Sequence, residues 1–137
     1  MKRFWPLLLL FAFDYALAID VPCKETLEEE VEAAEVIVLA SIEEDSLNSE
    51  GVGEIKFKVK AQWKGEALEY LPITVNAKFP FSESESGFYL IYANRFNNEN
   101  KSYWGVPWCK QVQHMEYSEL DFRLLKKPEY WNGKKNI

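Results

Sequence analysis

Histidine and cysteine, which supply most metal ligands and many catalytic groups, are scarce in this chain of 137 residues. His114 is the only histidine, and no cysteine pair or second histidine stands at the spacing of a zinc site. No serine or cysteine lies in a recognisable nucleophile motif, and there is no glycine-rich phosphate loop. The acidic run Glu43-Glu44-Asp45 lacks the spaced ligands of a calcium loop. We therefore expect a protein that is not an enzyme and holds no metal or cofactor.

Basic side chains are also in the minority. The chain has 16 lysines and arginines against 22 aspartates and glutamates, which gives a net charge of −6. An acidic protein repels the phosphates of nucleic acids, so nucleic-acid binding is not expected. The aromatic content of 15% is high for a disordered chain and indicates a packed core.

Long apolar runs are absent except at the N-terminus, where Phe4–Phe13 follows two basic residues. Ala16-Leu17-Ala18 then supplies the small residues that a signal peptidase needs. This layout predicts a cleaved secretory signal over residues 1–18, because the apolar run is too short to span a bilayer. The alternative is an uncleaved anchor, which the charge of Asp14 disfavours. We expect a secreted protein, extracellular or periplasmic, with no membrane span.

Removal of the signal leaves enough chain for one compact domain. In an oxidising compartment, its only two cysteines, Cys23 and Cys109, are expected to form one disulfide. The chain-entropy model gives a disulfide that closes so long a loop about 4–5 kcal/mol of stabilisation.

A short helix is predicted over residues 24–34, at the start of this domain. Leu27, Val31 and Ala34 recur at helical spacing and form an apolar stripe. The glutamates between them are expected on a solvated face; they are Glu28, Glu29, Glu30 and Glu32.

A second short helix is predicted towards the C-terminus. Ser118 and Asp121 resemble a capping sequence at its start, and Lys126-Lys127-Pro128 ends it. Its apolar stripe is expected to be Leu120, Leu124 and Leu125. Residues 127–137 are predicted to be a tail with a frayed end.

Five strands are predicted between the two helices. The clearest is Glu54–Trp63, in which apolar residues alternate with lysines. We expect its apolar side chains in the core and its lysines in water; these are Ile55, Phe57, Val59, Ala61 and Trp63 against Lys56, Lys58 and Lys60. The other strands are predicted at 36–42, 71–77, 88–93 and 103–112, the last with Trp104 and Trp108 facing inward.

Loops are predicted at 43–53, 79–87 and 94–102, between these short strands. The pattern predicts an all-β fold with flanking helices, and it favours a small closed barrel over a sandwich, because closure removes exposed sheet edges. The predicted organisation is a signal at 1–18, one domain at 19–126 and a tail at 127–137.

Several local motifs are shared with a known family. A glutamate-rich helix led by Cys23 runs into an apolar strand, and the long alternating strand ends in Gln62-Trp63-Lys64-Gly65. Gly87 precedes Phe88–Tyr92, and a late strand carries Cys109. From Cys23 to Leu125 the chain resembles the tissue inhibitors of metalloproteinases (TIMPs) and netrin-like domains. The resemblance implies a five-stranded OB-fold barrel between two short helices, with Cys23 tethered to the last strand through Cys109.

The inhibitors of this family chelate the protease zinc through the free amine and the carbonyl of an N-terminal cysteine. Here the predicted cleavage leaves Ile19–Pro22 ahead of Cys23, so the nitrogen of Cys23 is an amide and cannot bind zinc in the same way. The chain also has a single cysteine where the family commonly has Cys-x-Cys, and none near Phe79-Pro80-Phe81.

We therefore expect a monomeric, secreted, non-catalytic module that binds a protein partner. The alternative is a metalloprotease inhibitor whose N-terminus is processed to Cys23, with a zinc metalloprotease as partner. A sugar-binding OB domain or a small hydrolase ranks third. Interfaces favour aromatic side chains on accessible loops. The residues expected to contact the partner are Cys23, Lys24, Phe79, Phe81 and Phe96.

Overall fold

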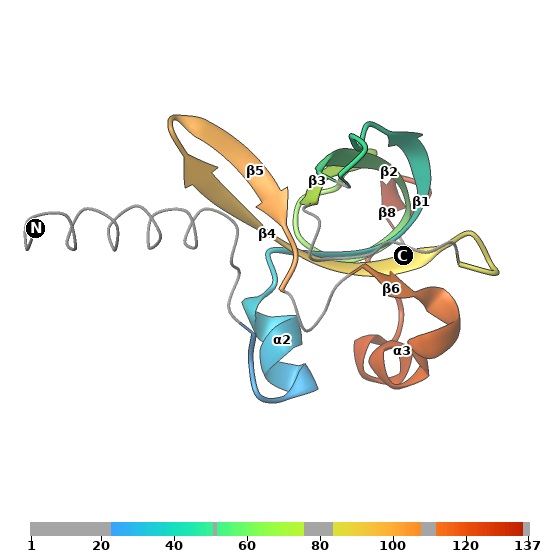
Figure 1. Cartoon of the computed structure of the whole chain (residues 1–137). Coiled ribbons are helices and arrows are strands. Elements are labelled where there is room, and N and C mark those ends of the chain that lie inside the picture. The colour runs from blue at the N-terminus through green and yellow to red at the C-terminus, as the bar shows by residue number, and fades with distance from the viewer. Residues whose placement is uncertain (1–22, 51, 76–83, 108–111, 136–137) are drawn as a thin grey trace, which may run out of the picture.

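The protein is mostly β-sheet, with one short helix before the strands and another near the C-terminus (Figure 1). The computed structural model describes residues 23–50, 52–75, 84–107 and 112–135. The helices are α2 (Leu27–Ala33), α3 (Glu119–Leu125) and the short 3-10 helix η2 (Met115–Tyr117). The strands are β1 (Val36–Asp45), β2 (Gly53–Lys64), β3 (Tyr70–Val75), β4 (Tyr89–Asn98), β5 (Lys101–Gly105), β6 (Gln113–His114), β7 (Tyr130–Trp131) and β8 (Lys134–Lys135).

The first five strands form a closed ring. Strand β1 pairs with both β2 and β4, and the order around the ring is β1-β2-β3-β5-β4. All of these pairings are antiparallel except that of β3 with β5, which is parallel and joins Ile73 to Trp104. The prediction of an all-β fold with short flanking helices is confirmed.

The main hydrophobic core lies inside the ring. Alternate residues of neighbouring strands point inward, because side chains on a strand alternate between its two faces. This core is formed by Val36, Val38, Ala40, Ile55, Phe57, Leu71, Ile73, Val75, Tyr89, Ile91 and Ala93, all of them buried. The sequence pattern predicted the inward positions of the first half of β2 correctly.

A second core lies on the outer face of β1 and β4, where α2 and α3 sit side by side (Figure 1). Ile37, Leu90 and Tyr92 are buried there. Leu27 and Val31 of α2 and Phe122 and Leu125 of α3 pack against them. Strands β1 and β4 are therefore covered on both faces, which explains their nearly continuous apolar sequences. Within the described ranges, no helix is long and apolar enough to cross a membrane.

Helix α2 begins at Leu27, where the side chain of Thr26 accepts a hydrogen bond from the backbone N–H of Glu29 and caps the helix. The predicted apolar stripe is confirmed, but the prediction for Glu30 is wrong. Its side chain is only 4% exposed and accepts a hydrogen bond from the backbone N–H of Lys24. The segment before the helix thus folds back onto α2 and covers that carboxylate.

Strand β2 carries an irregularity that the sequence pattern did not reveal. The register pairs Leu39 with Ala61 and Ala40 with Val59, so Lys60 is skipped as in a β-bulge. The period of two is broken there, and Trp63 packs in the second core with Phe122 instead of inside the ring. Its predicted place inside the ring is therefore wrong.

Gln62 is buried instead, opposite Val38. Its side-chain NH₂ donates to the carbonyls of Lys64 and Glu66, and its carbonyl accepts from the backbone N–H of Leu68. This amide is therefore satisfied, and it holds the turn between β2 and β3.

The start of α3 differs from the predicted capping sequence. Ser118 is fully buried, and its hydroxyl donates to the carbonyl of His114 and accepts from the side chain of Gln113, so it does not cap the helix. Leu120 is 70% exposed, so its place in the predicted stripe is wrong, whereas Leu125 packs in the second core as predicted. Phe122 and Leu125 face the second core, because α3 packs against α2 and the sheet from one side only. The helix ends before Lys126, as predicted.

The residues expected to be a frayed tail form a small hairpin instead. Strand β7 pairs with β2, joining Ala61 to Trp131, and β8 pairs with β7. Asn132 and Gly133 both have positive φ at its turn, which is the conformation that tight hairpins require. The ammonium of Lys60 lies 5.5 Å from the centre of the Trp131 ring. The sheet therefore extends beyond residue 126.

Candidate functional site

The most distinctive surface feature is a hairpin made of the outer half of β4 and the whole of β5, which we call the distal hairpin (Asn94–Gly105). The inner half of β4, up to Ala93, pairs with β1. Beyond that point β4 pairs with β5, from Asn94 opposite Gly105 to Asn98 opposite Lys101. Figure 1 shows the hairpin projecting away from the ring. The predicted loop at 94–102 is therefore wrong.

The turn of the distal hairpin explains why two strands form where a loop was predicted. Glu99 and Asn100 connect the strands, with φ of 50° and 66°. Two consecutive positive φ values define a type I′ turn, whose twist matches that of paired strands. The segment is rich in polar residues because both faces of the hairpin reach solvent, and a solvated hairpin has the composition of a loop.

One face of the distal hairpin carries two stacked aromatic rings. Phe96 and Tyr103 are directly opposite across the strand pair. Their ring centres are 5.5 Å apart, with an angle of 27° between the planes. Both side chains are half-buried. Such a pair gives a stiff apolar surface, since each ring restricts the rotation of the other.

The opposite face carries Arg95 and Trp104, also directly opposite one another. The guanidinium carbon of Arg95 lies 4.6 Å from the centre of the Trp104 ring, a cation–π contact. Trp104 also packs against the main core, as predicted for this inward position. It therefore anchors the base of the distal hairpin to the ring.

Hydrogen bonds also join the hairpin base to the segment between α2 and β1. The backbone N–H of Glu35 donates to the side-chain oxygen of Asn94 at 3.0 Å. In return, the backbone N–H of Arg95 donates to the carboxylate of Glu35 at 3.1 Å. The direction in which the hairpin projects is thus set relative to α2.

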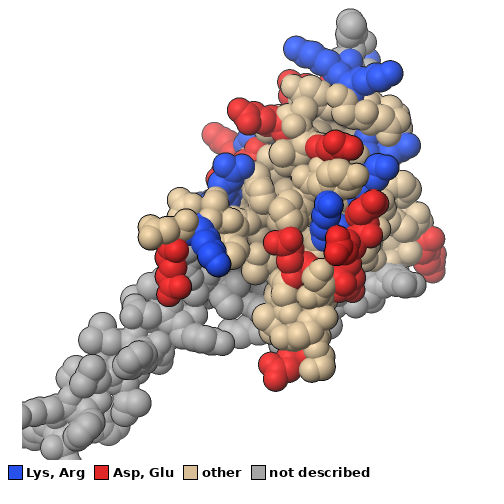
Figure 2. All heavy atoms as spheres, turned by 90° about the horizontal axis from the view of Figure 1, so that it is seen from above, with Lys and Arg blue, Asp and Glu red and all other residues tan. Residues whose placement is uncertain are grey.

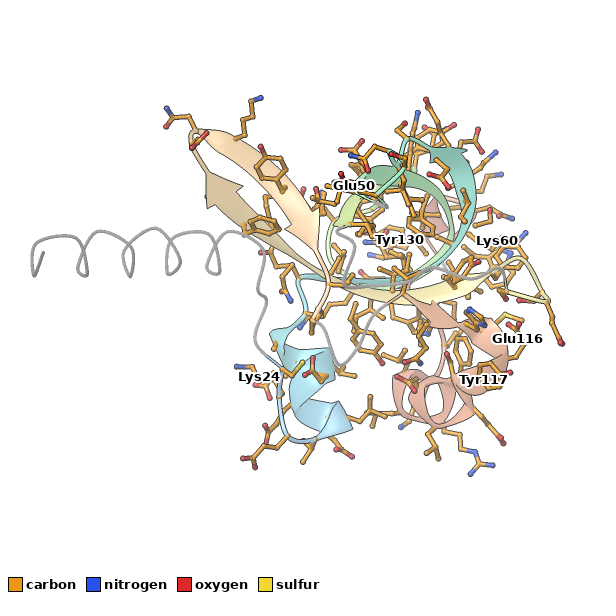
Figure 3. The ribbon with its side chains drawn as sticks, in the orientation of Figure 1. Lys24, Glu50, Lys60, Glu116, Tyr117 and Tyr130 are labelled. Carbon is orange, nitrogen blue, oxygen red and sulfur yellow. The ribbon has the colours of Figure 1, made fainter. Side chains whose placement is uncertain are left out.

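The predicted contact residues are distributed over separate parts of the molecule. Of these, Phe96 lies on the distal hairpin. Cys23 and Lys24 lie just before α2, and Figure 3 shows Lys24 beside that helix. Phe79 and Phe81 lie outside the described residues, as do Trp108 and Cys109, so the disulfide between Cys23 and Cys109 stays a prediction.

Sequence reasoning missed Arg95 and Tyr103 as members of this surface. Asn94 and Asn97, on either side of Arg95 and Phe96, made the segment resemble a polar loop, so the alternation of β4 was not recognised there. A test for alternation continued past Ala93 would have placed Arg95 and Phe96 on opposite faces.

His114 is half-buried and lies between two aromatic rings, edge-on to Tyr89 and stacked on Tyr117. Its ring centre lies 5.5 Å from that of Tyr89 and 5.8 Å from that of Tyr117. Tyr89 is buried, and Tyr117 is 80% exposed at the outer end of the stack. Within the described parts of the chain, no three metal-ligating side chains come together.

Glu116 holds the turn before β4. Its carboxylate accepts hydrogen bonds from the hydroxyls of Ser84 and Ser86 and from the backbone N–H of Glu85. These bonds, led by that from Ser84, lower the pKa of Glu116 to about 2. The residue thus acts as a permanent anion at neutral pH, and Figure 3 shows it close to Tyr117 near the start of α3.

Charged side chains do not gather in one area of the molecular face seen in Figure 2. Over most of that face, acidic and basic side chains are interspersed.

In comparisons with known proteins, no family model, curated protein or solved structure matches this chain.

Proposed function

We propose that this chain is a secreted, non-catalytic protein-interaction module of the TIMP and netrin-like type, built on an OB-type barrel. The ring order β1-β2-β3-β5-β4 and the parallel contact between β3 and β5 support the barrel, since OB folds are five-stranded Greek-key barrels. Short helices before and after the ring agree with the resemblance seen in the sequence.

The observation that carries the proposal is the distal hairpin. It presents Phe96 and Tyr103 on one face and Arg95 over Trp104 on the other. Aromatic residues and arginine are the side chains that most often dominate the affinity of protein interfaces. Because Trp104 and Glu35 hold its base, the hairpin loses little conformational entropy when a partner binds.

The surroundings of His114 and Glu116, two residue types that often act in catalysis, also favour binding over catalysis. His114 is packed between two aromatic rings, and Glu116 is held by three neighbouring residues and stays ionised. A general acid or base needs a pKa near the working pH, which Glu116 does not have.

A matched pair of variants tests the proposal. The double variant Phe96→Ala and Tyr103→Ala removes the stacked rings, and Tyr117→Ala removes an exposed ring elsewhere. Each purified protein would be immobilised and exposed to extracellular fluid from its source, and bound proteins would be identified by mass spectrometry and then purified for affinity measurement. We expect a partner that binds the original protein and Tyr117→Ala equally, and the double variant at least tenfold more weakly.

Equal affinity for all three proteins would show that the distal hairpin is not the contact surface. Circular dichroism and thermal melting of the variants would show that any loss of binding does not come from unfolding.

The second candidate function is metalloprotease inhibition through an N-terminus processed to Cys23. One contact favours it: the backbone N–H of Lys24 donates to the buried carboxylate of Glu30. A chain that began at Cys23 would therefore have its first peptide unit held against α2. Identifying the N-terminal residue of the secreted protein would separate the two functions, since only a chain that begins at Cys23 has a free amine on that residue to bind zinc.

A further inference from the structure

The distal hairpin carries the sequence Asn100-Lys101-Ser102 at its turn. In this sequence an asparagine is followed two residues later by a serine, with no proline between them. This is the acceptor sequence for N-linked oligosaccharide, which occurs on surface loops of secreted proteins. A tripeptide this simple also arises by chance, so its place in the fold decides whether the transferring enzyme can reach it.

The fold places all three residues at an accessible tip. Asn100, Lys101 and Ser102 are exposed, at the end of the hairpin that is farthest from the ring (Figure 1). Asn100 is the second residue of the type I′ turn, with φ of 66°, a conformation that asparagine tolerates better than most residues. Among the described residues, its side-chain amide has no hydrogen-bond partner, so a sugar attached there would break no contact of the fold.

We propose that Asn100 carries an N-linked oligosaccharide. In this reaction the Nδ2 atom of Asn100 attacks C1 of the first sugar of a lipid-linked oligosaccharide, and an Nδ2–C1 bond forms. The bond between C1 and the pyrophosphate oxygen breaks, lipid pyrophosphate leaves, and the nitrogen loses one proton. The hydroxyl of Ser102 is the part of the acceptor sequence that the transferring enzyme requires.

This inference rests on the secretion that forms part of the proposed function, and it narrows the contact surface. Two residue pairs lie between the turn and the pair Phe96–Tyr103, which is closer to the ring. A carbohydrate on Asn100 would cover the tip and leave the two stacked rings and the base of the hairpin open. The partner would therefore approach the sides of the distal hairpin near the ring.

The test is expression of the full chain, with its own residues 1–18, in eukaryotic cells that glycosylate secreted proteins. Protein from the medium would be analysed by intact mass before and after treatment with peptide-N-glycosidase. We expect a mass above that of the mature chain by one oligosaccharide, lost on treatment, with aspartate left at position 100.

Three variants assign the modification. Ser102→Ala leaves Asn100 and the turn unchanged but destroys the acceptor sequence, so the added mass should disappear. Ser102→Thr keeps the acceptor sequence, and Asn97→Gln changes an asparagine outside it, so both should keep the added mass. Carbohydrate that persists on Ser102→Ala would overturn the assignment to Asn100.

The failures of the two proposals are distinguishable. Protein in the medium that lacks carbohydrate would overturn the glycosylation of Asn100 and leave secretion standing. Unmodified protein that stays in the cytosol with residues 1–18 attached would overturn both.

Discussion

The hydroxyl of Tyr92 on β4 donates a hydrogen bond of 2.7 Å to the carboxylate of Asp121 on α3, and both side chains are buried. This bond crosses the second core and joins the C-terminal helix to the sheet. Burial, followed by the hydrogen bond and the charge of Asp121, raises the pKa of Tyr92 well above its ordinary value of 10.0. The phenol of Tyr92 therefore keeps its proton at any pH near neutrality, and it remains the donor of this hydrogen bond.

Tyr92→Phe is expected to lower the free energy of unfolding by about 1.5–3 kcal/mol, because hydrogen bonds to charged groups contribute about that much and the carboxylate stays buried without the donor. Urea denaturation measures the change. Tyr117→Phe, at a ring that is 80% exposed, is the control and should stay within about 0.5 kcal/mol. Equal, small losses would mean that the bond contributes nothing to stability.

The inner and outer faces of β2 should respond very differently to truncation. Phe57 is fully buried in the main core, so Phe57→Ala should cost about 3–5 kcal/mol from lost burial and the cavity left behind. Lys58 is its exposed neighbour, so Lys58→Ala should change stability by less than about 0.5 kcal/mol. Denaturant melts of the two variants compare the faces directly, and equal losses would contradict the assigned register.

Glu116 should make the turn at residues 84–86 sensitive to acid. The pKa of Glu116 in the folded protein is about 2, below its ordinary value of 4.5. Its stabilising contribution is therefore complete above about pH 4.5 and is lost as the pH falls towards 2. The protection factor of the Glu85 amide against hydrogen exchange, which corrects for the intrinsic pH dependence of the rate, should fall over this range. Glu116→Gln should remove that dependence, whereas Glu28→Gln, at an exposed carboxylate on α2, should leave it unchanged.

Cys23 and Cys109 are predicted to form one disulfide, because the chain has no other cysteines and the proposed secretion would place it in an oxidising compartment. Intact mass of the native protein after alkylation, with and without prior reduction, checks this. We expect no alkylation before reduction and two alkylated sites after it. Two reactive thiols in the native secreted protein would contradict the prediction.

The form that begins at Ile19 is expected not to inhibit zinc metalloproteases by chelation, because its Cys23 nitrogen is an amide. Titration of a zinc protease with this form and with one that begins at Cys23 checks the prediction. Weak inhibition by the second form alone would support the alternative function under N-terminal processing. Tight inhibition by the form beginning at Ile19, abolished when its amine is acetylated, would show that another N-terminal geometry works.

Much of the fold followed from the sequence by itself. The alternation of Ile55 and Phe57 placed the first half of β2, and the stripe of Leu27 and Val31 placed α2. The apolar sequence of residues 36–42 placed β1. These features depend on the spacing of apolar residues along one segment, and that spacing is a property of the sequence alone.

The candidate site depended far more on the tertiary structure. Phe96 was predicted as a contact residue, but its partner Tyr103 and the pair Arg95 and Trp104 came together only through the pairing of β4 with β5. A polar segment is compatible with a loop or with a solvated hairpin, and the choice depends on whether the strands can pair across a turn such as Glu99-Asn100.

The burial of particular side chains was likewise decided by contacts between distant segments. Trp63 lies outside the ring because β1 skips Lys60 in the pairing, and Glu30 is buried because the segment at Lys24 folds over it. Tyr130 and Trp131 form a strand because β2 offers them a partner strand. The sequence determined the strongly periodic helices and strands, such as α2 and β2. Pairing register and packing between segments decided the polar hairpins and which side chains each surface presents, because those energies exist only once distant segments meet.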